Sequence, residues 1–226
     1  MYYRYYDDEC DAIKIGTGFL VTTTDLDGRQ FIVTSAHTIS TSAEASSMDV
    51  FFGYENDGCT GSFAGTPFCT SGATLLASDT LYDFTLLELD GPIPTAEEPF
   101  FTGWDVSGVP PDEAFAIHHP KGHPKKISIE ADPLTTVTFD FPDTNSCYYF
   151  DMAPSAHWSV NHDFGGMAEG SSGSPLLHPD GLSIGVASAR FFGCASWSYY
   201  SKMSEIAANV PEFRQYLDPN NSNVIR

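Results

Sequence analysis

Short segments rich in β-branched and aromatic residues recur along the chain, separated by Gly, Pro, Asn and Asp. Turn signals such as Asp27-Gly28 and Pro179-Asp180-Gly181 stand between them. Short strands at this spacing are typical of an antiparallel barrel or sandwich. The predicted strands are Ile13–Thr24, Gln30–Thr34, Met48–Tyr54, Thr74–Leu76, Phe84–Leu89, Ala114–His118, Thr135–Phe141, Leu176–Leu177 and Leu182–Arg190.

A helical pattern occurs only near the end of the chain. Ser204–Asn209 is long enough for a turn or two, and Pro211–Leu217 begins with a proline followed by an acid, as the first turn of a helix often does. Neither piece is long enough to form a core. The pattern therefore predicts an all-β protein with a short C-terminal helix, and the Pro/Gly/Asp-rich passage Gly103–Asp112 is the candidate connector between two halves.

Composition and charge narrow the possible partners. The chain has 226 residues, enough for one large core or two small ones, and 30 acids against 10 bases give a formal charge of −20. Phosphate binding needs clustered Lys and Arg, so nucleic acid is excluded as a partner and an anionic membrane surface is disfavoured. No apolar run approaches the roughly 18 residues that membrane insertion needs. The dispersed acids fit a solvated surface, a saline habitat or attraction of basic substrates, and composition leaves these three open.

Three short segments carry candidate chemistry, in the order His, Asp, Ser: Thr34–His37, Asp83–Leu89 and Gly170–Pro175. A serine hydroxyl is a poor nucleophile unless a histidine removes its proton. The histidine in turn needs a buried carboxylate that fixes its tautomer and stabilises its positive form. His37 and Asp83 are 46 residues apart, and Asp83 and Ser172 are 89 apart, so only a folded domain can bring them together.

The segment Gly170–Pro175 is the most specific of the three. Its glycines permit a sharp turn that presents a hydroxyl, and the amides of Gly170 and Ser172 are the expected donors to the oxyanion that forms on attack. Ser171 and Ser174 are rival nucleophiles. An ordinary serine- and glycine-rich loop is the alternative interpretation of this segment taken alone.

The other histidines do not predict a metal site. His118, His119 and His123 lie in one short tract, but their spacing matches no common zinc pattern and no cysteine completes it. His157, His162 and His178 are expected in loops or on the surface. We predict neither a metal nor a cofactor.

Taken together, the segments resemble the trypsin-like serine peptidases, and within them the bacterial lysyl endopeptidases. The resemblance covers most of the chain through these stretches: Gly16–Val21, Asp83–Leu89, Gly103–Asp105, Ala116–Pro120 with Lys126–Ser128, His157–Val160, Gly165–Pro175 and Leu217–Pro219. It implies two antiparallel β-barrels with the site in the cleft between them. Residues 1–105 would form the first barrel, with His37 and Asp83, and residues 106–226 the second, with Ser172 and the C-terminal helix.

The resemblance also implies roles and an activity. His37 would be the general base, Asp83 its orienting carboxylate and Ser172 the nucleophile of a serine endopeptidase that acts through an acyl-enzyme. Protein or peptide substrates are the implied partners. A catalytically silent homologue that uses the cleft as a binding scaffold is the alternative. An esterase is disfavoured, because Gly170–Pro175 lacks the Gly-x-Ser-x-Gly elbow.

The chain departs from its relatives around the first specificity pocket. Trypsin carries an acid six residues before the nucleophile, where this chain has Gly166, and the region matching the acid of lysyl endopeptidases, Ser196–Lys202, has none. Cleavage after lysine is therefore not expected to dominate, because a buried basic side chain would lack a partner. Arg190 could narrow the pocket, pair with an acidic substrate side chain or point to solvent. The implied pocket residues are Gly166, Ser188, Ala189, Arg190 and Ser198.

Ser171 precedes the predicted nucleophile, where mammalian trypsin-like zymogens have an aspartate that pairs with a newly cut N-terminus. Activation by that ion pair is not expected.

The cysteines bear on the cellular compartment. The chain has five cysteines, and none of them forms a CxxC motif: Cys10, Cys59, Cys69, Cys147 and Cys194. In the relatives, cysteines that match Cys59 and Cys194 are bridged to the N-terminal region, where only Cys10 remains here. The start has no signal-peptide pattern, so either the protein stays inside the cell or its natural start is missing. The odd cysteine count favours the second alternative, a missing N-terminal portion with signal and propeptide. We therefore expect disulfides, secretion and a possible propeptide or inhibitor as a further partner.

Overall fold

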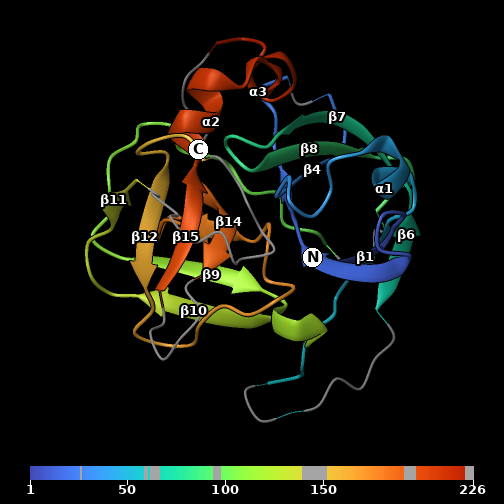
Figure 1. Cartoon of the computed structure of the whole chain (residues 1–226), viewed down its shortest axis with the longest axis horizontal. Coiled ribbons are helices and arrows are strands. Elements are labelled where there is room, and N and C mark those ends of the chain that lie inside the picture. The colour runs from blue at the N-terminus through green and yellow to red at the C-terminus, as the bar shows by residue number, and fades with distance from the viewer. Residues whose placement is uncertain are drawn as a thin grey trace.

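The computed structural model describes residues 1–25, 27–58, 61, 67–93, 98–138, 152–190 and 197–221. These residues form mainly antiparallel strands, arranged in three sheets (Figure 1). None of the described helices has the length and apolarity needed to cross a membrane.

The first sheet is built around the N-terminal strand. Its order is β2-β1-β5-β6, with the bounds β1 (Tyr2–Asp7), β2 (Ala12–Thr17), β5 (Asp49–Phe52) and β6 (Phe68–Ser71). In β1 the side chains of Tyr3, Tyr5 and Asp7 are buried, and those between them are more exposed. The sequence pattern does not predict this strand, because tyrosine occupies both faces and hides the alternation.

The second sheet holds the segments that lead to two of the candidate residues. Its order is β3-β4-β8-β7, with the bounds β3 (Phe19–Val21), β4 (Phe31–Thr34), β7 (Ala73–Asp79) and β8 (Phe84–Leu89). The strand predicted over Phe84–Leu89 is confirmed. The single strand predicted over Ile13–Thr24 is wrong, because β2 and β3 belong to different sheets. The chain passes between them at Gly18, where a β-carbon would lie 3.0 Å from Ile32 Cγ2.

The third sheet is formed by the second half of the chain. Its order is β10-β9-β13-β14-β15-β12-β11, with the bounds β9 (Ala114–His118), β10 (Lys126–Glu130), β11 (Thr135–Val137), β12 (His157–Asn161), β13 (Pro175–Leu177), β14 (Ser183–Arg190) and β15 (Trp197–Lys202). The prediction for Ala114–His118 is confirmed. The strand predicted over Thr135–Phe141 ends at Val137 in β11, and residues 139–141 lie outside the described part.

Few residues are helical. The elements are α1 (Ser42–Ser46), the 3-10 turn η2 (Pro120–Gly122), α2 (Met203–Asn209) and α3 (Pro211–Tyr216). The last two confirm the predicted C-terminal helical pieces. Helix α1 was not predicted, although Thr41 and Glu44 form a capping box that a Thr-x-x-Glu pattern signals.

Three hydrophobic cores hold the sheets together. One lies within the first half and includes Tyr3, Met48 and Leu87, and one lies within the second half and includes Leu176 and Tyr200. The third joins strands of both halves to the C-terminal helices, where the Phe213 ring meets the edge of Trp104 at 5.1 Å between centroids. In Figure 1 these helices lie beside β7 and β8.

The arrangement of the sheets brings the two halves into contact near the candidate site. The two four-stranded sheets use residues 2–89, and the seven-stranded sheet uses residues 114–202. Strand β4 contacts β14 across the halves, so the segment after β4 lies near β14. The boundary expected at residues 105/106 falls between the sheets and stays a prediction.

Candidate active site

His37 and Asp83 lie at adjacent ends of paired strands. His37 follows β4 and Asp83 precedes β8, and the β4–β8 pairing sets Thr34 opposite Thr85. His37 Nδ1 lies 2.7 Å from Asp83 Oδ2, and the His37 backbone N–H donates to Oδ1 at 2.8 Å. A carboxylate at Nδ1 selects the tautomer with its proton there, which leaves Nε2 able to accept a proton.

Asp83 is fixed by its backbone as well as by its partners. Asp79 Oδ1 accepts the amides of Leu81 at 2.9 Å and Tyr82 at 3.0 Å, which closes a turn just before Asp83. Asp83 itself has a φ of 46°, a left-handed conformation that aspartate tolerates better than most residues. The tight turn and this backbone conformation therefore fix the direction in which the Asp83 side chain points into the protein interior.

The surroundings of Asp83 favour its charged form. The residue is 0 % exposed, and Ser188 Oγ donates to Oδ2 at 2.5 Å. Burial by itself raises the pKa of this carboxyl, but the charge of His37 and the hydrogen bonds from His37 and Ser188 outweigh burial and lower it below the ordinary value. Asp83 is thus an ionised carboxylate at neutral pH.

The three serines of the Gly170–Pro175 segment differ in exposure. Ser171 and Ser174 are 0 % exposed, whereas Ser172 is only half-buried. The Ser171 hydroxyl is also engaged, since it lies 2.8 Å from His118 Nδ1 and accepts the Ala168 amide at 3.2 Å. Ser172 is thus the one of the three that retains access to solvent.

The serine segment packs against both of the other candidate segments. The Gly173 amide donates to the Ala187 carbonyl at 2.8 Å, one residue before the Ser188 that binds Asp83. A β-carbon at Gly173 would lie 2.0 Å from Thr34 Oγ1 and 3.0 Å from the Ser35 nitrogen, so the backbone here touches the segment that leads to His37. The described hydrogen bonds do not include one between Ser172 Oγ and His37, so the meeting of nucleophile and base stays a prediction.

This close contact gives a stability prediction. We expect Gly173→Ala to lower the free energy of unfolding by roughly 2–5 kcal/mol, because the methyl group meets Thr34 and Thr17 and the φ of 81° is left-handed. Gly28→Ala is the matched control, since Gly28 has the same φ of 81° but nothing within 4 Å of an added β-carbon. Gly28→Ala should cost only about 1 kcal/mol. Urea unfolding of both variants measures the difference, and equal losses would contradict the contact.

From Ala168 to Ser172, every backbone carbonyl accepts a hydrogen bond. The Ala168 carbonyl accepts from the Ser171 amide (2.9 Å), the Glu169 carbonyl from the Lys121 amide (2.5 Å) and the Gly170 carbonyl from Thr17 Oγ1 (2.7 Å). The Ser171 carbonyl accepts from the Ser174 amide (3.1 Å), and the Ser172 carbonyl accepts from the Thr17 amide (3.0 Å). In contrast, the amides of Gly170 and Ser172 donate to no acceptor among the described residues. These are the two amides predicted to bind an oxyanion.

The predicted pocket residues are only partly brought together. Strand pairing sets Arg190 opposite Ser198, which is buried, and residues 191–196 lie outside the described part. Gly166 donates its amide to Ser128 Oγ at 2.8 Å and faces open space. Ser188 directs its hydroxyl to Asp83, so this side chain supports the carboxylate, and Ala189 next to it is half-buried. The sequence offered no signal for this role of Ser188.

The histidine tract forms a buried hydrogen-bonded segment. His118 is 1 % exposed and His119 is 2 % exposed, and burial lowers the pKa of His118 to about 4 and that of His119 to about 2, so both are neutral. His157 and His162 were expected in loops or on the surface. The prediction is wrong for His157, which is 0 % exposed within β12, whereas His162 lies outside the strands, just after β12, but is only 6 % exposed. His178 does lie in a loop.

Among the described residues, one group of potential metal ligands lies close together: Glu130, Asp132 and Asp163. Their carboxylates already serve the local backbone, since Glu130 accepts the Asp132 and Asn161 amides and Asp163 accepts the Ala131 amide. This cluster is explained by turn formation.

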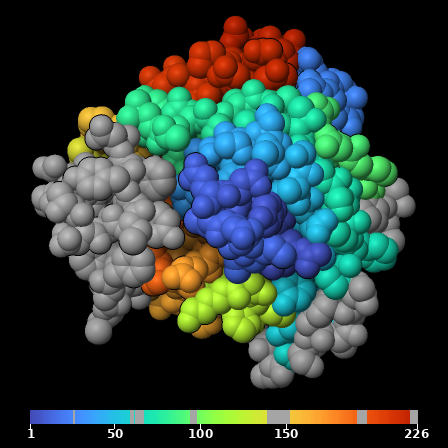
Figure 2. Space-filling view, turned by 45° about the vertical axis from the view of Figure 1, so that its right-hand side comes forward, coloured from blue at the N-terminus to red at the C-terminus, as the bar shows by residue number. Residues whose placement is uncertain are grey.

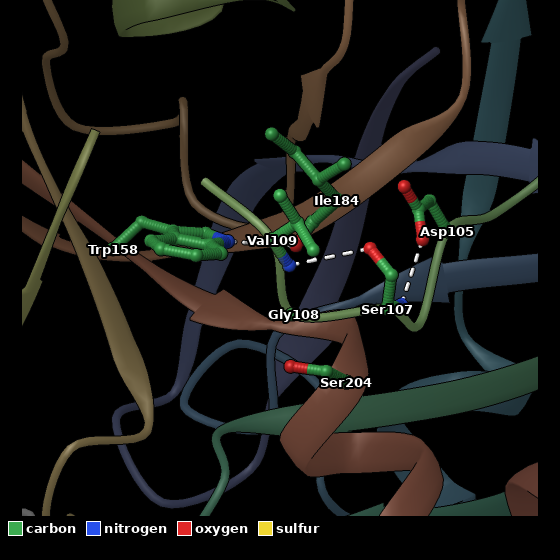
Figure 3. Close-up of a pocket in the computed structure, with 7 residues that line it drawn as sticks. All are labelled: Asp105, Ser107, Gly108, Val109, Trp158, Ile184 and Ser204. Carbon is green, nitrogen blue, oxygen red and sulfur yellow. Dashed lines mark hydrogen bonds between the residues drawn. The ribbon is translucent and has the colours of Figure 1, made fainter. Parts of the chain in front are cut away.

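A small hollow lies away from these segments (Figure 3). Its walls come from the connector after Trp104, from β12 and β14 and from the first turn of α2. Figure 3 shows Val109 lying between Trp158 and Ser107, with no residue of the His37, Asp83 or Ser172 segments drawn among the lining side chains. The hollow is not the candidate active site.

Two cysteines can be placed. Cys10 and Cys69 are exposed and free, and Cys59, Cys147 and Cys194 lie outside the described residues. The disulfides expected from the sequence therefore stay a prediction, although Cys10 is not bridged here.

The fold is that of the trypsin-like serine proteases. The active form of the Rv3671c protease from M. tuberculosis superimposes with a TM-score of 0.61 at 18% identity, over 93% of this chain and 78% of that one. The scabies mite inactivated protease paralogue S-I1 gives 0.63 at 15% identity, over 95% and 93% of the two chains. At these identities the likeness establishes the fold alone, which active and inactivated proteins share.

The family follows from the sequence comparison. The family model of the lysyl endopeptidase C-terminal domain matches residues 4–201, and the chain belongs to this family. Lysyl endopeptidase of Pseudomonas aeruginosa is 30% identical over 131 residues, which make up 56% of this chain and 28% of that protein. The match thus spans under a third of the length of that relative.

Proposed function

We propose that the protein is a serine endopeptidase in which Ser172 is the nucleophile, His37 the general base and Asp83 the orienting carboxylate. The observation that carries the proposal is the distance of 2.7 Å between His37 Nδ1 and Asp83 Oδ2. The Asp83 carboxylate in this pair is fully buried. The contact of Gly173 with the segment before His37 supports the presence of the half-buried Ser172 beside this pair.

The reaction follows from these roles. His37 Nε2 takes the proton of Ser172 Oγ as the oxygen attacks the carbonyl carbon, and the carbonyl π electrons move to its oxygen. The amides of Gly170 and Ser172 donate to the resulting oxyanion. As the tetrahedral species collapses, the C–N bond breaks and His37 gives its proton to the leaving amine.

The second half of the reaction repeats the sequence with water. His37 takes a proton from a water molecule, whose oxygen attacks the acyl-enzyme carbonyl. Collapse releases the new carboxyl group and returns the proton to Ser172 Oγ. Asp83 remains ionised throughout and stabilises the imidazolium, which matches its lowered pKa.

The proposed substrates are proteins or peptides, and lysine is not the expected dominant side chain at the cleaved bond. The family name points to lysine, but no acid occurs at Gly166 or anywhere in residues 186–204. A lysine ammonium buried in that region would lose its hydration without gaining a counter-charge.

A peptide library tests activity and preference together. We expect cleavage that a sulfonyl fluoride abolishes and a metal chelator does not, with lysine no more than one of several accepted residues. A sharp preference for lysine would contradict the pocket assignment but leave the peptidase intact. Absence of cleavage and of covalent labelling in a well-folded sample would favour the alternative, a silent homologue that binds partners in the cleft.

We also propose that the enzyme acts outside the cytosol, on the strength of its family and its five cysteines. A propeptide or inhibitor that occupies the cleft is the partner this implies. Mass spectrometry of the unreduced protein, isolated from its natural source, would reveal the cysteine pairing, and five free thiols would count against secretion.

A further inference from the structure

The histidine tract, which the proposed mechanism does not use, makes a run of contacts to the backbone that precedes Ser172. From it, the Lys121 amide donates to the Glu169 carbonyl at 2.5 Å. The His119 amide donates to Thr17 Oγ1 at 3.1 Å, and that hydroxyl donates to the Gly170 carbonyl at 2.7 Å. Two successive carbonyls are thus held, one directly and one through Thr17.

These bonds set the direction of the Gly170 amide. In a trans peptide the C=O of one residue and the N–H of the next point in opposite directions. With the Glu169 carbonyl fixed toward Lys121, the Gly170 N–H must point away from the η2 turn. That amide has no acceptor among the described residues, as an oxyanion donor requires.

The η2 turn is itself held by the first half of the chain. The His119 ring stacks on Tyr54 with 5.8 Å between centroids and 9° between planes, and Tyr54 Oη donates to the Gly122 carbonyl at 3.1 Å. His119 Nδ1 lies 3.1 Å from the His123 carbonyl, which closes the turn. In Figure 2 the yellow-green residues of this region lie against the blue N-terminal residues.

The geometry of the turn is unusual. Lys121 has a φ of 54° and Gly122 a φ of 67°, so two successive residues are left-handed. An L-residue in this conformation carries a cost of roughly 1–2 kcal/mol. The Lys121 side chain is exposed, and only the Lys121 backbone contacts the serine segment. The left-handed conformation therefore serves to direct the Lys121 amide toward the Glu169 carbonyl.

The side chain before the nucleophile is held without charge. Ser171 Oγ lies 2.8 Å from His118 Nδ1, and His118 Nε2 lies 2.9 Å from Ser128 Oγ, which accepts the Gly166 amide. Ser171 is therefore held by a chain of neutral, buried hydrogen bonds.

We propose that Thr17 and the His118–His123 segment form a cradle that fixes the two peptides on either side of the Gly170 α-carbon. Lys121 holds the Glu169 carbonyl and Thr17 holds the Gly170 carbonyl, so that the Gly170 N–H is presented to the oxyanion, and Thr17 is the central positioning residue of the cradle. The inference rests on the proposed function, because it assigns the cradle to the oxyanion site of that reaction. Thr17 is suited to the role, since it is 0 % exposed and its amide also holds the Ser172 carbonyl at 3.0 Å.

The first test compares Thr17→Val with Thr17→Ser. Valine keeps the branched shape but leaves the Gly170 carbonyl and the His119 amide without the hydroxyl, so we expect kcat to fall about 10²-fold with little change in KM. Serine keeps the hydroxyl and should restore kcat to within a few-fold of wild type. Equal kcat values for Thr17→Val and wild type would overturn the proposal. A kcat of Thr17→Ser as low as that of Thr17→Val would overturn it as well.

The second test examines the turn by crystallography, with a readout independent of activity. Lys121→Pro removes the amide and forces φ to about −65°, whereas Lys121→Gly keeps the amide and favours positive φ. We expect the Glu169–Gly170 peptide to be reoriented in Lys121→Pro and unchanged in Lys121→Gly. An unchanged peptide in Lys121→Pro would overturn the cradle, even if the wild type cleaves peptides. A wild type that neither cleaves nor labels would overturn the peptidase, while the crystal structures would still decide on the cradle.

Discussion

Ser172→Ala is expected to lower kcat by roughly 10⁶-fold, the order found when the nucleophile of another Ser-His-Asp protease is removed. Without Oγ no acyl-enzyme can form, and His37 has no hydroxyl proton to accept. The fold should be unaffected, because Ser172 is half-buried and its side chain makes no described hydrogen bond. Steady-state hydrolysis of a chromogenic peptide, with the unfolding transition of both proteins, measures the effect.

The matched control is Ser174→Ala, two residues away in the same loop. Ser174 is 0 % exposed, so its hydroxyl cannot reach a substrate, and its variant should stay within a few-fold of wild type. If Ser172→Ala kept most of the activity, or Ser174→Ala lost as much, the nucleophile assignment would be incorrect.

Asp83→Asn is expected to lower kcat by roughly 10⁴-fold, as the same change does in another Ser-His-Asp protease. An amide nitrogen in place of Oδ2 presents a donor to His37 Nδ1, so the ring must take the tautomer whose proton is on Nε2. That nitrogen can then no longer accept the proton of Ser172. The KM should change less than kcat, because Asp83 is wholly buried beneath the histidine.

The same variant tests the charge of Asp83 through pH. Its folded pKa lies below the ordinary value, so the fold gains stability from the ionised form above the unfolded pKa of about 3.9. That gain is lost as the pH falls through the lower folded pKa. The stability advantage of wild type over Asp83→Asn should therefore be greatest near neutrality and shrink in acid, as denaturant titrations at several pH values would reveal. A difference independent of pH would indicate a neutral Asp83.

Ser188→Ala provides the control for Asp83→Asn. It removes one hydrogen bond from the carboxylate but leaves both contacts with His37, so about a tenfold loss in kcat is expected. A loss as large as that of Asp83→Asn would mean that Ser188 acts in more than a supporting role.

The sequence carried the parts of the fold and site that are local in the chain. Phe84–Leu89 and Ala114–His118 are apolar runs bounded by turn residues, and both strands have the predicted bounds. Each of these strands depends on a handful of consecutive residues. The pairing of His37 with Asp83, which are 46 residues apart, was instead anticipated from the resemblance of their segments to a known family.

The missed features depend on contacts between distant segments. His118 and Ser171 are 53 residues apart, and Thr17 and Gly170 are 153 apart, so no local pattern could reveal that the histidine tract supports the serine loop. His157 was expected in a loop or on the surface, yet it lies in β12, between β11 and β15, and is 0 % exposed. Tyrosine on both faces of β1 concealed a strand that helps to hold the η2 turn, since the Tyr2 ring lies 5.9 Å from the ring of His119.

The identity of the nucleophile can be determined in one experiment. The wild-type protein would be treated with a fluorophosphonate, its mass gain measured intact, and the modified peptide sequenced by tandem mass spectrometry. We expect one adduct per chain, on Ser172, and none after denaturation or in His37→Ala. An adduct on Ser171, Ser174 or another residue, or no adduct on the folded protein, would contradict the assignment of Ser172 as the activated serine.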